Sequence, residues 1–160
     1  MLYSSKVKEM SVPVQTAMII DDDADLSQLL ATILETRKIH VLTVQTLWEA
    51  EECLACMKPS VIFLDNSFPE GLGINFIRNI KSADTEIKII MMTADTSLWI
   101  RQKALDEGIN YFLEKPFSKE IINEVLDKLK MKKTEAADLT DYSTRGYRKS
   151  KTDSDNGAGE

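Results

Sequence analysis

Short apolar runs alternate with amphipathic stretches along most of the chain, and this alternation restricts the fold more than any other feature. The runs are rich in Ile, Val, Leu and Met, as is typical of strands buried on both faces. Between the first two runs, Leu26, Leu30 and Ile33 recur at helical spacing. Five strands, each followed by a helix, are therefore predicted at residues 17–20, 40–45, 61–65, 87–92 and 111–114.

The predicted helices have suitable residues at their ends. Thr46 and Glu49 have capping-box spacing, Ser118 can cap the last helix, and Gly108 can end the fourth. Five strand–helix units are too few for an eight-stranded barrel of about 250 residues. The pattern predicts an α/β fold of the flavodoxin-like, doubly wound type, with a five-stranded parallel sheet of order 2-1-3-4-5.

The chain is acidic, with 20 Lys or Arg against 26 Asp or Glu and a net charge of −6 at pH 7. Binding to nucleic acid or to anionic lipid relies on clustered basic residues, so neither is expected. No apolar run approaches the roughly 18–20 residues of a membrane-spanning helix, and the first residues lack the apolar centre of a secretory signal. A cytoplasmic protein is predicted.

Sequence character changes near both ends. Residues 1–14 have no regular pattern, so a flexible leader is predicted. Residues 133–160 are polar and poor in aliphatic side chains, which is typical of disorder. One domain is expected at 15–132. Because the tail is too short and polar to form a second domain, a stand-alone module is predicted, although a fragment of a longer protein would have a similar sequence.

The two cysteines, Cys53 and Cys56, have the C-x-x-C spacing of redox pairs and zinc ligands. They lie late in a predicted helix, whereas redox pairs lie at helix N-termini, where a thiolate is favoured. No second pair completes a zinc site. Both are interpreted as small packing residues.

Four of the predicted strand ends carry groups suited to phosphoryl chemistry, namely Asp21 and Asp22, Asp65, Thr93, and Lys115. In an open parallel sheet these ends form the ligand-binding edge. Carboxylates from separate strands suit Mg²⁺, and a carboxylate beside such a cation can attack phosphorus to give an aspartyl phosphate. Taken singly, each residue has an ordinary structural explanation, such as a helix cap at Asp23; their joint placement favours function.

Four segments resemble the signature segments of response-regulator receiver domains of two-component systems. In order along the chain they are IIDDD (19–23), FLDNSFPEGLG (63–73), MMTAD (91–95) and EKPF (114–117). The resemblance implies that a histidine kinase or phosphotransfer protein donates a phosphoryl group to Asp65, with Mg²⁺ as cofactor. By position, Asp22 matches a direct Mg²⁺ ligand, Asp21 its water-mediated partner, and Ser67 a ligand through its backbone carbonyl.

The resemblance also implies a switch. Thr93 matches the hydroxyl that turns toward the phosphoryl group, and Lys115 the lysine that pairs with it, with a cis bond to Pro116. Phe112 matches the switch aromatic; because it lacks a hydroxyl, its signal would rest on burial of the ring. Gly73 matches the loop after the acceptor.

A downstream protein is expected to bind the face formed by the fourth helix, fifth strand and fifth helix. Trp99, Ile100, Leu105 and Lys119 lie on or near this face. A phosphorylation-dependent homodimer is a further option. The sequence specifies neither the kinase nor the target.

Two other classes fit part of the pattern. A pseudo-receiver would share the fold without phosphorylation, but it would lack an acceptor, a metal-binding acid or the lysine, and all are present. A phosphatase of the haloacid-dehalogenase type would begin with D-x-D-x-[TV]. Asp21 and Asp23 fit that motif, but Asp25 stands at the Thr/Val position and no cap domain is predicted. Apart from self-catalysed phosphoryl transfer and dephosphorylation, no enzymatic activity is expected.

Overall fold

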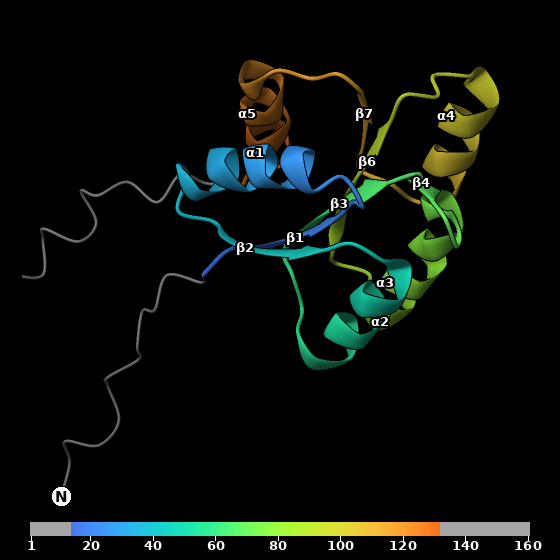
Figure 1. Cartoon of the computed structure of the whole chain (residues 1–160), viewed down its shortest axis with the longest axis horizontal. Helices are drawn as coiled ribbons and strands as arrows, with labels where there is room; N and C mark the ends of the chain where they lie inside the picture. Colours follow the sequence, from blue (N-terminus) through green and yellow to red (C-terminus); the bar gives the residue numbers. More distant parts are fainter. Residues whose placement is uncertain (1–13, 132–160) are drawn as a thin grey trace, which may run out of the picture.

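The structure, a computed structural model, describes residues 14–131. A central sheet is covered by helices on both sides, with α1 and α5 on one face and α2, α3 and α4 on the other (Figure 1). All five strands are parallel, in the order β2-β1-β3-β6-β7. Along the chain this order is 2-1-3-4-5, so the predicted fold is confirmed. The strands are β1 (Thr16–Ile20), β2 (His40–Val44), β3 (Val61–Asp65), β6 (Lys88–Thr93) and β7 (Tyr111–Glu114).

Five α-helices follow these strands. They are α1 (Ala24–Glu35), α2 (Leu47–Cys56), α3 (Ile77–Ala83), α4 (Leu98–Asp106) and α5 (Lys119–Lys128). Strand β3 is buried along its whole length and divides the core. Ile62 and Leu64 pack toward α2, α3 and α4, whereas Val61 and Phe63 pack toward α1 and α5. Burial on both faces explains why the strands are solid apolar runs and not alternating ones.

The helix caps lie largely where the sequence places them. The side chains of Asp23, Thr46 and Ser118 each accept a hydrogen bond from the backbone N–H three residues later. The Glu49 carboxylate accepts a hydrogen bond from the backbone N–H of Gln45 at 2.9 Å. In a standard capping box the acceptor would bind the N–H of the cap residue, Thr46, so the box is shifted by one residue. Gly108 lies directly after the C-cap of α4 and has a φ of +96°, a conformation that favours glycine.

The segment between β3 and α3 is more structured than the predicted loop. It forms a small antiparallel hairpin, β4 (Ser67–Phe68) with β5 (Gly71–Leu72), and then a 3₁₀ turn, η1 (Gly73–Phe76). The third helix therefore begins at Ile77, and Ile74 lies in the 3₁₀ turn. Two-residue strands are too short to show an alternating pattern, which is why periodicity does not predict them.

Three other expectations concern features away from the sheet. Cys53 packs against the core, as predicted, but Cys56 is exposed, so the packing interpretation is wrong for that residue. Over residues 14–131, no helix has the length and apolar character needed to cross a membrane. The predicted leader, except for the exposed Val14, and the predicted tail at 133–160 lie outside the described residues.

Candidate functional site

The candidate site lies at the carboxyl edge of the sheet, where β1, β3, β6 and β7 end. Asp21 directly follows β1, Asp65 ends β3, and Thr93 ends β6; all three are buried. Lys115 directly follows β7, and its N–H donates to the carbonyl of Thr93 at 2.9 Å. Parallel pairing in register thus brings together residues that are up to 94 positions apart in the sequence.

The Lys115 ammonium joins two of the carboxylates. Its Nζ donates to Asp21 Oδ2 at 2.9 Å and to Asp65 Oδ1 at 3.0 Å. The side chain of Lys115 is 21% exposed, while those of Asp21 and Asp65 are almost fully buried. Buried charges require partners, so this bridge holds the Asp65 carboxylate in a fixed position. The bond between Lys115 and Pro116 is cis, as expected.

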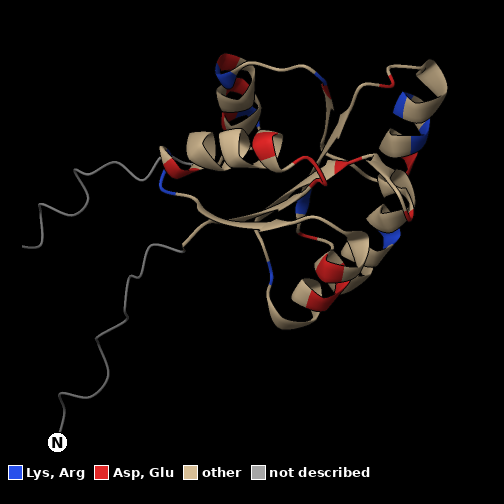
Figure 2. Cartoon of the chain, in the orientation of Figure 1, with Lys and Arg blue, Asp and Glu red and all other residues tan. Residues whose placement is uncertain are grey.

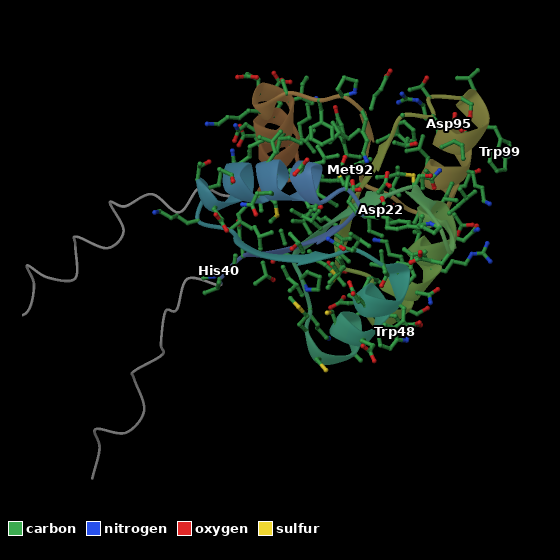
Figure 3. All side chains as sticks on the ribbon, viewed as in Figure 1. Asp22, His40, Trp48, Met92, Asp95 and Trp99 are labelled. Atoms are coloured by element: carbon green, nitrogen blue, oxygen red, sulfur yellow. The ribbon has the colours of Figure 1, made fainter. Side chains whose placement is uncertain are left out.

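A third carboxylate completes an acidic cluster. Oxygen atoms of Asp21, Asp22 and Asp65 lie within 4.8 Å of one another, and Asp22 is the exposed member. Figure 3 shows Asp22 in the segment that joins β1 to α1, and Figure 2 shows acidic residues in the same segment. Three carboxylates face one ammonium, which leaves excess negative charge. Oxygen ligands and this charge fit a hard divalent cation.

Burial changes the proton affinity of both partners in the bridge. Burial raises the pKa of Asp65, and the neighbouring Asp21 raises it further, although Lys115 acts in the opposite direction. For Lys115, burial lowers the pKa, but hydrogen bonds and charge attraction from Asp21 and Asp65 outweigh it, so the pKa is raised overall. Lys115 therefore remains an ammonium at neutral pH.

The raised pKa predicts that an Asp65→Asn protein is more stable than wild type at pH 7 without divalent cations. An acid whose pKa is raised by folding contributes stability below its unfolded pKa and loses it as pH rises through the folded pKa. Urea unfolding in the presence of a chelator, at pH 7 and near pH 4, measures the difference in free energy of unfolding between Asp65→Asn and wild type. This difference should become smaller at the lower pH.

The exposed Asp22 supplies a control for this prediction. Asp22→Asn removes one negative charge from the same cluster but does not relieve a buried carboxylate. We expect a smaller gain in stability from Asp22→Asn than from Asp65→Asn. An Asp65→Asn protein less stable than wild type at pH 7 would contradict the assigned direction of the pKa shift.

Three further predicted residues lie around this cluster with different contacts. The Thr93 hydroxyl accepts from the N–H of Asp95 at 3.0 Å. The N–H of the exposed Ser67 donates to Asp65 Oδ2 at 3.3 Å. Phe112 is half-buried and borders the same pocket as Lys115. Of the residues predicted for the site, Asp21, Asp22, Asp65 and Lys115 are in closest association, whereas Phe112 lies further back in β7, opposite Met91.

The loop after β3 contributes two supporting residues. Buried Asn66 accepts at its side-chain oxygen from the N–H of Ile74 (3.0 Å) and at its carbonyl from the N–H of Gly73 (3.0 Å). A Cβ on Gly73 would lie 1.9 Å from the carbonyl oxygen of Asp65. Sequence reasoning did not identify Asn66, and it noted Gly73 only through the resemblance. For Asn66, the only sequence signal is that an amide residue directly follows the acid at the end of a predicted strand.

Comparison with known proteins gives the class to which this fold and site belong. The response regulator receiver domain model matches residues 17–127, and the chain belongs to this family. Among curated proteins, the KDP operon transcriptional regulatory protein KdpE of Escherichia coli is 32% identical over 100 residues, which are 62% of this chain and 44% of KdpE. The phosphate regulon transcriptional regulatory protein PhoB of Pseudomonas aeruginosa is 30% identical over 106 residues, 65% of this chain and 46% of PhoB.

Solved structures agree with this assignment. A two-component response regulator from Clostridium difficile has a TM-score of 0.70 and 26% identity, with 76% of this chain and 99% of that chain covered. The chain spans less than half the length of KdpE and of PhoB. These matches place the chain among the receiver domains of two-component signalling.

Proposed function

We propose that the chain accepts a phosphoryl group on Asp65 from a phosphohistidine of a histidine kinase or phosphotransfer protein. The observation that carries this proposal is the Lys115 ammonium bound to both Asp21 and Asp65 at the carboxyl edge of the sheet. Burying two carboxylates on one ammonium, with a third carboxylate beside them, costs free energy of folding. An arrangement with this cost favours a functional purpose over a purely structural one. In a receiver domain that purpose is phosphoryl transfer.

The proposed reaction forms one bond and breaks one. An Asp65 carboxylate oxygen attacks phosphorus, the phosphorus–nitrogen bond to the donor imidazole breaks, and the electron pair stays on that nitrogen. Phosphoryl transfer depends on positioning and charge neutralisation. Lys115, already 3.0 Å from Asp65, would neutralise charge on the phosphoryl oxygens without giving up its proton.

The acidic cluster would hold Mg²⁺ for this reaction. Its ligands would be the carboxylates of Asp22 and Asp65, the carbonyl of Ser67 and, through water, Asp21. A bound Mg²⁺ would offset negative charge on the transferred group. The support for this assignment is the oxygen-only donor set and its excess negative charge.

The switch would begin at Thr93. Its hydroxyl accepts from the N–H of Asp95, so a turn toward the phosphoryl group would cost that hydrogen bond. Phe112 would then move, and the face formed by α4, β7 and α5 would change its preference for a protein partner. On this face Trp99, Leu105 and Lys119 are exposed, whereas Ile100 is only 3% exposed and belongs to the core.

The biological setting is also proposed. We expect a cytoplasmic module that acts through protein contacts, including a phosphorylation-dependent homodimer as one form of output. The names of KdpE and PhoB describe transcriptional regulators, and that activity belongs to those longer proteins.

Incubation with acetyl phosphate and Mg²⁺ tests the phosphorylation. Intact-mass measurement should find one added phosphoryl group on the wild type and none on Asp65→Asn. Asp95→Asn is the matched control, because Asp95 is an exposed carboxylate near the same edge whose contacts are to the N–H of Ser97. An adduct that persists in Asp65→Asn, or no adduct on the wild type, would overturn the proposal.

A further inference from the structure

Phe112 lies between the core and an open pocket. It packs against the core cluster on the side of α2, α3 and α4, yet it remains half-buried. The pocket beside it has a volume of about 550 Å³, and Lys115, Pro116 and Ile121 also line it. The ring is three residues before the lysine of the site, and its movement would change this pocket. Phenylalanine has no hydroxyl, so a hydrogen bond cannot fix its position.

Arg101 covers the Phe112 ring. Its guanidinium carbon lies 4.4 Å from the ring centroid, well within the range of a cation–π interaction. Within residues 14–131 the Arg101 side chain makes no hydrogen bond or ion pair, so the ring is its specific partner. A second basic residue of α4, Lys103, stacks on another ring: its ammonium lies 5.2 Å from the centroid of Trp99 and donates to Asn75 Oδ1 at 3.4 Å.

The helix that carries Arg101 is lightly anchored. Only Ile100 and Ala104 of α4 are buried, compared with five buried residues of α1. Leu98 and Trp99 are 84% and 63% exposed, and Figure 3 shows Trp99 on the outer side of α4. Basic residues also mark this helix in Figure 2. Because so few residues of α4 are buried, the stack of Arg101 on Phe112 is a substantial part of the contacts that fix the positions of the helix and the ring.

We propose that Arg101 is a positioning residue that holds Phe112 in the resting state and thereby sets how readily the domain switches. This inference rests on the proposed function, because it concerns the response to a phosphoryl group at Asp65. Movement of the ring away from its resting place would break the stack. Loss of Arg101 should therefore raise the population of the switched state, and any ligand that favours that state should bind more tightly.

Beryllofluoride, an analogue of the phosphoryl group, provides the measurement. Fluorine NMR of wild type with Mg²⁺ and increasing beryllofluoride reports the bound fraction directly. Arg101→Met keeps an aliphatic cover over Phe112 but removes the cation, and it should bind about two- to fivefold more tightly than wild type. The variant Lys103→Met loses the same charge from the same helix and should not bind more tightly. Loss of positive charge alone would weaken attraction to an anion, so tightening cannot arise from that cause.

A second pair of variants tests whether the effect of Arg101 depends on the aromatic ring of Phe112. In a Phe112→Leu background the aromatic face is absent, and Arg101→Met should then change the affinity by less than twofold. Equal affinity of Arg101→Met and Lys103→Met, or the same tightening in both backgrounds, would overturn the role of Arg101. If wild type binds no beryllofluoride and accepts no phosphoryl group, the proposed function itself fails, and this outcome is distinct from the first two.

Discussion

A Gly73→Ala protein is expected to lose about 3 kcal/mol in its free energy of unfolding, at the upper end of the usual range for overpacking. The added Cβ would lie 1.9 Å from the Asp65 carbonyl oxygen, 3.0 Å from its carbon and 3.2 Å from the Cα of Asn66. All three are backbone atoms, so no flexible side chain can move aside. Relief requires a shift of the Asp65 backbone, and phosphorylation by acetyl phosphate should fall as well. Urea unfolding and intact-mass measurement check the two effects.

Gly108→Ala separates this steric clash from the general cost of replacing glycine. Gly108 has a φ of +96°, which side chains rarely adopt, but the nearest atom to an added Cβ is Lys81 Cε at 3.7 Å. Its substitution should cost about 1–2 kcal/mol through backbone conformation alone. It should leave phosphorylation of Asp65 unchanged. A Gly73→Ala protein no less stable than Gly108→Ala and fully phosphorylated would show that the loop yields without disturbing Asp65.

The sequence predicts the sheet well because burial on both faces leaves a strong local signal. Five apolar runs correspond to the five parallel strands, and the order is confirmed. The hairpin of β4 and β5 and the 3₁₀ turn at Gly73–Phe76 were not predicted. In this segment the side chain of Asn66 accepts from the N–H of Ile74, a contact between residues eight positions apart that no periodicity encodes.

For the site, the sequence predicts which residues share an edge, because the ends of neighbouring parallel strands meet there. It does not predict how they pair. That Lys115 binds Asp21 as well as Asp65, and that Asp22 stays exposed, depends on loop conformations after β1 and β7. The stack of Arg101 on Phe112 was likewise missed, since a charge on an amphipathic helix is ordinarily solvated.

Lys115→Met is expected to slow phosphoryl uptake from acetyl phosphate by about 10²–10³-fold, the usual effect of removing one group that stabilises developing charge. The same substitution should tighten Mg²⁺ binding. The ammonium lies 2.9 Å from Asp21 and 3.0 Å from Asp65, so it competes with a cation for both carboxylates. Rates follow from intact mass against time, and Mg²⁺ affinity from titration calorimetry. The two effects have opposite directions because Lys115 opposes metal binding but favours transfer.

Lys119→Met is the matched control for Lys115→Met. Lys119 is an exposed lysine at the start of α5, and within residues 14–131 it does not contact the acidic cluster. Its loss should leave both the transfer rate and the Mg²⁺ affinity close to wild type. If Lys115→Met weakens Mg²⁺ binding and transfer together, the carboxylates have lost their arrangement and Lys115 is a scaffold for the site. If Lys115→Met slows transfer but binds Mg²⁺ more tightly, the charge of Lys115 acts on the transferred group. Only that role predicts opposite changes in the transfer rate and the Mg²⁺ affinity.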